Sequence, residues 1–247
     1  MSLCRRIIPT LLMRGNNLVK GEQFNSWRNV GPVIQAMKIF ESRQVDELIL
    51  LDIGATPEGR GPNIEMVRHV AAECFTPLTV GGGVRSLYDI DDLLRAGADK
   101  VSICTAAFES PSLICDAAKK FGSQCIVVSI DVSDNKVITH CGSRLRESVP
   151  QRWALEAERE GAGEILLNSV DRDGTLCGYN LNLIKSMAKL VNIPVIASGG
   201  ARDYQDFYAA FQAGADAVAA GAMFQFTDAT PLEAKHHLAD NNIEVRL

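Results

Sequence analysis

The sequence predicts one closed (β/α)8 barrel, the TIM-barrel architecture, with residues 1–247 forming a single domain. Short runs rich in valine, isoleucine, leucine and alanine alternate eight times with helix-like stretches, as expected for parallel strands buried on both faces. The chain also repeats itself, because Gly199 lies 117 residues after Gly82 and Gly214 lies 117 residues after Gly97. A doubly wound open sheet is the alternative. Two halves of four units each favour closure into a barrel.

The expected strands are short and almost continuously apolar, and each precedes a helix. They cover residues 6–12, 47–53, 77–81, 100–104, 125–131, 164–170, 194–198 and 217–222. The expected helices cover residues 33–43, 64–72, 88–96, 110–121, 151–161, 181–190, 204–213 and 231–239. An extra hairpin is expected over residues 133–141, after the fifth strand.

Composition narrows the class of protein. A chain of 247 residues that is 47% hydrophobic can bury one full core. Its net charge of −5 argues against nucleic acid as a partner, and no apolar run is long enough to indicate a membrane span. The seven cysteines are scattered and odd in number, so we expect reduced thiols in a cytoplasmic protein. We expect no metal site and no organic cofactor.

Residues 194–202 have the pattern of a phosphate-binding turn: an apolar run, a glycine pair and then a helix-like stretch. Glycines let backbone amides approach an anion, although a plain tight turn needs the same residues. The repeat supplies two such cradles at the carboxyl ends of the strands. The first would contain Gly82, Gly83 and Thr105, and the second Asp173, Gly174, Gly199, Gly200, Gly221 and Ala222. Two cradles suit a ligand with a phosphate at each end, unless only one is still used.

Asp131 is the candidate general acid or base. It ends the fifth expected strand, so its carboxyl should lie at the floor of the pocket. Desolvation there would raise its pKa toward neutrality. The alternative is an aspartate that caps the next loop. In the repeat, residues 10–12 align with residues 129–131, so Leu12 is the counterpart of Asp131.

Charged residues are expected at both ends of the barrel. Arg6, Glu47, Lys100 and Glu164 stand at the starts of strands and should meet at the floor, either as a structural plug or as a gate for a small neutral molecule. At the top, Asp52 ends the second strand and is a candidate ligand contact. Lys20 lies in a polar first loop, residues 15–27, that is long enough to act as a lid. A loop lysine can also be merely solvated.

Several runs together resemble the cyclase subunit of imidazole glycerol phosphate synthase, the synthase half of a glutamine amidotransferase. The resemblance covers essentially the whole chain. It is carried by residues 6–9, 18–21, 51–53, 78–83, 97–102, 122–128, 171–175 and 195–200.

The resemblance implies a partner and a route. A separate glutaminase subunit would dock on the N-terminal face of the barrel and release ammonia, which would pass the four charged residues to a phosphorylated small molecule above. Histidine-pathway members use two aspartates as acid and base. Asp131 matches one of them, Leu12 replaces the other, and Cys104 and Cys141 stand where small polar residues are usual.

Leu12 therefore favours the paralogues that serve bacterial surface-polysaccharide synthesis and are thought to amidinate an acetamido group of a nucleotide-linked sugar. Two alternatives stay open. One is the histidine-pathway cyclase with rearranged acid and base roles. The other is a non-catalytic scaffold that binds phosphoesters and a glutaminase.

Overall fold

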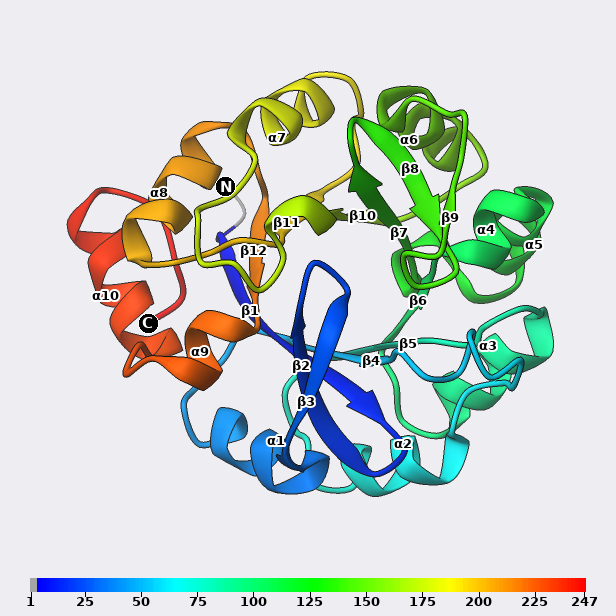
Figure 1. The fold of residues 1–247 in the computed structure, drawn as a ribbon, viewed down its shortest axis with the longest axis horizontal. Coiled ribbons are helices and arrows are strands. Elements are labelled where there is room, and N and C mark those ends of the chain that lie inside the picture. Colours follow the sequence, from blue (N-terminus) through cyan, green and yellow to red (C-terminus); the bar gives the residue numbers. More distant parts are fainter. Residues whose placement is uncertain (1–3) are drawn as a thin grey trace.

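The structure, a computed structural model, describes residues 4–247 and is a closed parallel barrel surrounded by helices (Figure 1). Eight parallel strands pair in the order β1, β4, β5, β6, β7, β10, β11 and β12, and β12 pairs with β1 to close the ring. The predicted fold class is confirmed. The strands are β1 (Arg6–Arg14), β4 (Leu48–Asp52), β5 (Leu78–Gly81), β6 (Lys100–Ile103), β7 (Ile126–Ser133), β10 (Glu164–Ser169), β11 (Val195–Ser198) and β12 (Ala217–Ala220).

The helices form the outer layer of the barrel. Those predicted from the sequence are α1 (Val33–Glu41), α2 (Ile64–Ala71), α3 (Leu87–Arg95), α5 (Ser112–Phe121), α6 (Pro150–Arg159), α7 (Leu181–Ala188), α8 (Tyr204–Gln212) and α10 (Pro231–Asp240). Two short helices were not predicted, α4 (Thr105–Glu109) and α9 (Ala222–Phe226), and both directly follow a strand. Single 3-10 turns are η1 (Ser123–Cys125) and η2 (Val170–Arg172).

The internal repeat is visible in the hydrogen bonds at the bottom of the barrel. Asp99 Oδ2 accepts a hydrogen bond from Leu78 N at 2.8 Å. In the second half, Asp216 Oδ2 accepts one from Val195 N at 3.1 Å. Each aspartate lies 21 residues after its partner, so the two halves fix their strand starts in the same way.

The interior of the barrel is layered, because alternate residues of each strand point inward. The middle layer is apolar and buried, and consists of Ile8, Ile49, Val127, Leu166, Ile196, Ala217 and Ala219, with Leu51 packed against it. Charged side chains lie below this layer, and polar ones lie above it. The opposite faces of the strands pack against the helices in a second, larger core.

Two antiparallel hairpins extend from the top of the barrel. Residues 15–27, expected to be a polar loop, instead contain β2 (Asn17–Glu22) and the start of β3 (Asn25–Pro32). This hairpin projects over the centre of the ring (Figure 1). The predicted second hairpin is confirmed, with β8 (Lys136–Thr139) pairing with the end of β7 and β9 (Arg144–Leu145) extending it. Within residues 4–247, no helix has both the length and the apolar character needed to cross a bilayer.

Candidate active site

A pocket of about 270 Å³ opens at the carboxyl ends of the strands. Every residue that the sequence analysis expected at this end lines it: Lys20, Asp52, Gly82, Gly83, Thr105, Asp131, Asp173, Gly174, Gly199, Gly200, Gly221 and Ala222. The four charged residues predicted for the floor are absent from its lining. The residues predicted for the pocket and the four charged residues predicted for the floor therefore lie at different levels of the barrel.

Asp131 lies in β7 with only 8% of its surface exposed. Its carboxylate accepts hydrogen bonds from Cys104 Sγ at 3.5 Å and from Ser129 Oγ at 3.3 Å. Burial raises the pKa of Asp131 from its ordinary 3.8 to about 6, against the opposing effect of hydrogen bonds from Cys104, Ser129 and Asn168. A carboxyl that titrates near neutrality can both accept and return a proton.

Leu12 occupies the corresponding place in the other half of the barrel. It lies on β1, four strands from β7 around the ring, and it is 6% exposed and lines the pocket. A leucine cannot transfer a proton. The pocket therefore has a titrating carboxyl on one side and an apolar side chain on the other.

Asp52 is already engaged within the protein. Its two carboxylate oxygens accept hydrogen bonds from Arg60 at 2.7 and 3.0 Å, and Gly54 N donates to it at 3.0 Å. A buried carboxylate held in this way orients the loop after β4. This arrangement directs the guanidinium of Arg60, which also lines the pocket, toward Asp52.

The second cradle contains a buried cation. Lys20, on β2, is only 3% exposed, so it is not a solvated loop lysine. Its ammonium lies so close to Gly221 that a Cβ at that position would overlap it. Burial lowers the pKa of Lys20 and raises the pKa of Asp173, while the opposite charges of the two groups act against both shifts. The ammonium and the glycine turns provide a site with the charge to receive a phosphate.

The glycine pairs of the two cradles have equivalent backbones. Gly82 and Gly83 have φ values of 101° and 75°, and Gly199 and Gly200 have values of 87° and 110°. A Cβ at any of them would overlap neighbouring atoms, including the backbone of Asp52 at Gly82. Glycine is thus required for the turns themselves, and phosphate binding by these turns stays a prediction.

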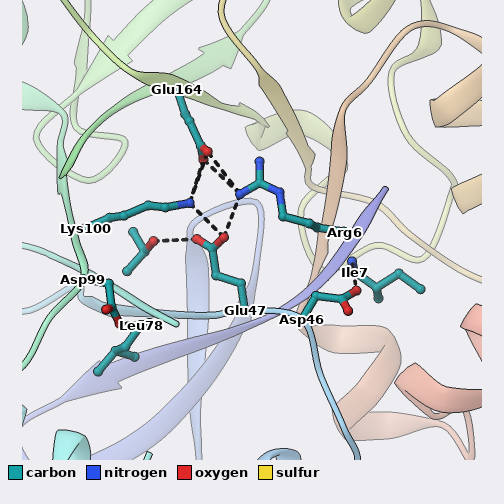
Figure 2. Close-up of polar contacts among 9 residues, drawn as sticks. Arg6, Ile7, Asp46, Glu47, Leu78, Asp99, Lys100 and Glu164 are labelled. Atoms are coloured by element: carbon teal, nitrogen blue, oxygen red, sulfur yellow. Dashed lines mark hydrogen bonds and ion pairs between the residues drawn. The ribbon is translucent and has the colours of Figure 1, made fainter. Parts of the chain in front are cut away.

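The four charges at the floor form one closed network (Figure 2). Glu47, 2% exposed, accepts hydrogen bonds from Arg6 at 2.7 Å, Lys100 at 2.9 Å and Thr79 at 2.7 Å. Glu164 contacts the same two cations, each at 3.1 Å. One buried and three partly buried charges arranged in this way are mutually compensated. The network lies below the apolar layer, and both the plug and the gate remain predictions for it.

A polar ring just above the apolar layer was not predicted from the sequence. Thr10, Ser102, Ser129, Asn168 and Ser198 all line the pocket from inward-facing strand positions. Thr10 and Ser129 each stand two residues before a position that we had singled out, so the period of two along a strand was a usable signal. The hairpin side chains Phe24 and Trp27 also line the pocket, and no local pattern indicated them.

The chain is similar to known proteins over nearly its whole length. The family model described as "Histidine biosynthesis protein" matches residues 6–230. Imidazole glycerol phosphate synthase subunit HisF of Dictyoglomus thermophilum is 45% identical over 250 residues, which cover 99% of each chain. The subunit of the same name from Corynebacterium glutamicum is 44% identical over 257 residues, covering both chains fully. That of Mycobacterium tuberculosis is 43% identical over 255 residues, covering 99% of this chain and 96% of the relative. The chain therefore belongs to the histidine biosynthesis protein family and is a HisF-like member of it.

Proposed function

We propose that this chain is the ammonia-consuming synthase subunit of a glutamine amidotransferase and that it forms imidazole glycerol phosphate. The observation that carries the proposal is Asp131, a buried carboxyl without an ion-pair partner among residues 4–247. It lies at the floor of a pocket at one end of the barrel, and four paired charges lie at the other end. The similarity to HisF subunits, which extends over nearly the whole length of the chain, supports the same chemistry.

In this proposal Asp131 moves the proton. At neutral pH most of this carboxyl is ionised, since its pKa is about 6. It can accept a proton from an attacking ammonia and return it to a leaving group. Lys20 and the glycine turns would hold the phosphates, which fixes the reacting atoms beside the carboxylate.

The glutaminase would dock at the N-terminal face of the barrel. The four-charge network lies at that end, and Phe75, in the connection between α2 and β5, is 87% exposed there. A large exposed aromatic side chain is a frequent anchor of protein interfaces. Ammonia would then cross the single apolar layer between the network and the pocket.

The main expectation of the sequence analysis, sugar amidination for polysaccharide synthesis, gains no support from the relatives. They favour the alternative, the histidine-pathway cyclase. One observation keeps amidination as a second candidate, namely that Leu12 leaves the pocket without the second carboxyl of the ring-closing reaction. Amidination needs ammonia and one acid or base.

A direct assay separates the candidates. The purified chain is incubated with an ammonium salt and the phosphorylated histidine-pathway precursor, and imidazole glycerol phosphate is measured. We expect product, and we expect Asp131→Asn to lose about 10²–10⁴-fold in rate. Absence of product from the unaltered chain, with product from Leu12→Asp, would overturn the proposal in favour of amidination. An unaffected Asp131→Asn rate would remove Asp131 from the mechanism.

A further inference from the structure

The carboxylate of Asp131 accepts hydrogen bonds from two neighbouring side chains, and a third polar side chain lies opposite it on the next strand. Cys104, at the junction of β6 and α4, donates its thiol hydrogen to Oδ2 at 3.5 Å. Ser129, two residues earlier on β7, donates to Oδ1 at 3.3 Å. Asn168 lies opposite Asp131 in the β7–β10 register, and its proximity opposes the rise in the pKa of Asp131.

The internal repeat provides a built-in comparison for this cluster. The register of β6 against β7 places Ile103 opposite Val128, and the register of β12 against β1 places Ala220 opposite Pro9. These pairs are equivalent in the two halves. The counterparts of Cys104, Ser129 and Asn168 around Leu12 are therefore Gly221, Thr10 and Leu51.

The cluster around Leu12 has no carboxylate at this position, and its hydroxyl group is unpaired within residues 4–247. The Oγ1 atom of Thr10 is buried and has no hydrogen-bond partner among the described residues, whereas its counterpart Ser129 donates to Asp131. Gly221 has no side chain where Cys104 has its thiol. At this strand end, the half with the carboxylate has a thiol that donates to it, whereas the other half has a glycine beside the Lys20 ammonium.

We propose that Cys104 is a positioning residue for Asp131, whose thiol fixes the orientation of the carboxylate and stabilises its ionised form. The inference rests on the proposed function, in which Asp131 transfers the proton. Because Cys104 occupies Oδ2 and Ser129 occupies Oδ1, the remaining lone pairs are the ones available to a ligand in the pocket.

The neighbouring charges do not account for the stabilisation of the ionised form of Asp131. Besides Cys104, the ionisable groups that interact with Asp131 are Cys141, from the turn between β8 and β9, and Asp173, from the loop after η2. Burial raises the pKa of both thiols, that of Cys141 to about 12, so both are neutral at physiological pH. Asp173 repels the ionised form of Asp131, and Lys20 faces Asp173. Cys104 therefore acts through its donated hydrogen bond and not through a charge.

The test is a titration of Asp131 followed by carbon-13 NMR of its carboxyl, with the resonance assigned from its loss in Asp131→Asn. We expect the midpoint to lie near 6 in the unaltered chain and to rise by about half a pH unit in Cys104→Ala, because a donor to the ionised form is lost. Cys104→Ser, which keeps a donor, should recover most of this change. Cys115→Ala, on the outer helix α5, should leave the midpoint unchanged. An unchanged midpoint in a folded Cys104→Ala variant would overturn the proposal.

A second measurement does not require the alanine variant to fold. The S–H stretching band of Cys104 in the infrared spectrum should differ between the unaltered chain and Asp131→Asn, since a carboxylate accepts a stronger hydrogen bond than an amide oxygen. Identical bands would also overturn the proposal.

Kinetics link this inference to the reaction while keeping the two proposals distinguishable. The acidic limb of the ammonia-dependent pH–rate profile should move upward in Cys104→Ala by the same amount as the NMR midpoint. If the unaltered chain shows no ammonia-dependent activity, the proposed function fails, whereas the titration and the infrared band still decide the role of Cys104.

Discussion

At the scale of single residues, the buried carboxyl of Asp131 should make the stability of the fold depend on pH. Its pKa is about 6 in the folded chain and 3.8 ordinarily, so the folded state binds the extra proton between these two values. Stability should therefore fall as pH rises from 4 to 6, by at most about 3 kcal/mol from this group. Asp131→Asn should unfold at a higher temperature than the unaltered chain at pH 7. This gain should vanish at pH 4, and calorimetry at the two pH values checks it. An equal gain at both pH values would contradict the assignment.

Glu47 carries a second prediction at this scale. It is 2% exposed and neutralises both Arg6 and Lys100. Glu47→Ala should lower the free energy of unfolding by about 3 kcal/mol, because it removes the buried partner of two partly buried cations. Glu73→Ala, which breaks the exposed pair with Lys38, serves as the control and should change it by about 0–1 kcal/mol. Urea denaturation measures both. Similar losses would mean that the floor network is more hydrated than its burial indicates.

Whether a site residue or a contact could be predicted from the sequence depends on where its contact partners lie. Asp131 was predictable because a strand end in a barrel points into the pocket. Its contact with Cys104 was not, because it depends on the register between β6 and β7. The pairing of Asp52 with Arg60 spans an irregular loop, and no local periodicity encodes it.

At the scale of elements, the eight strands and their long helices were predictable, since each has an apolar pattern of its own. The helices α4 and α9 have five residues each, too few for a helical period to show. The β2–β3 hairpin is polar in sequence and is held by distant contacts. Gln23 N donates to Asp173 O and Gln23 Nε2 to Asp171 O, both at 2.8 Å.

This hairpin yields the third prediction. Gly174 has φ of 76°, and a Cβ there would overlap the carbonyl oxygen of Gly21 in β2. Gly174→Ala should push the hairpin off the loop that follows η2 and release Lys20 from the second cradle. We expect weaker binding of imidazole glycerol phosphate by roughly tenfold, equivalent to about 1.4 kcal/mol.

The matched control for this prediction is Gly59→Ala. Gly59 has a similar φ of 67°, but no atom lies within 4 Å of the added Cβ. The Gly59→Ala substitution therefore introduces the same backbone strain without the clash. Titration calorimetry of both variants gives the comparison. Equal affinities would show that the position of the hairpin does not affect binding.

At the scale of the whole molecule, the proposal depends on how the two ends of the barrel communicate. The charge network and the pocket are separated by one layer of apolar side chains, to which β12 contributes its smallest members, Ala217 and Ala219. Ala217 stands opposite Arg6 in the β1–β12 register, next to a member of the network. If ammonia crosses the barrel here, it must pass this position.

Ala217→Leu should therefore obstruct the axis while leaving the pocket unchanged. With the glutaminase bound, the rate driven by glutamine should fall, whereas the rate driven by added ammonium salt should persist because ammonium reaches the pocket from its open mouth. Val218→Leu is the matched control on the same strand, since Val218 is equally buried but faces the helices. Both substitutions should lower stability by about 1–3 kcal/mol through overpacking. The ratio of the glutamine-driven rate to the ammonium-driven rate therefore separates an effect on passage through the barrel from general damage to the fold. If this ratio is the same in Ala217→Leu as in the unaltered chain, the route of ammonia lies outside the barrel.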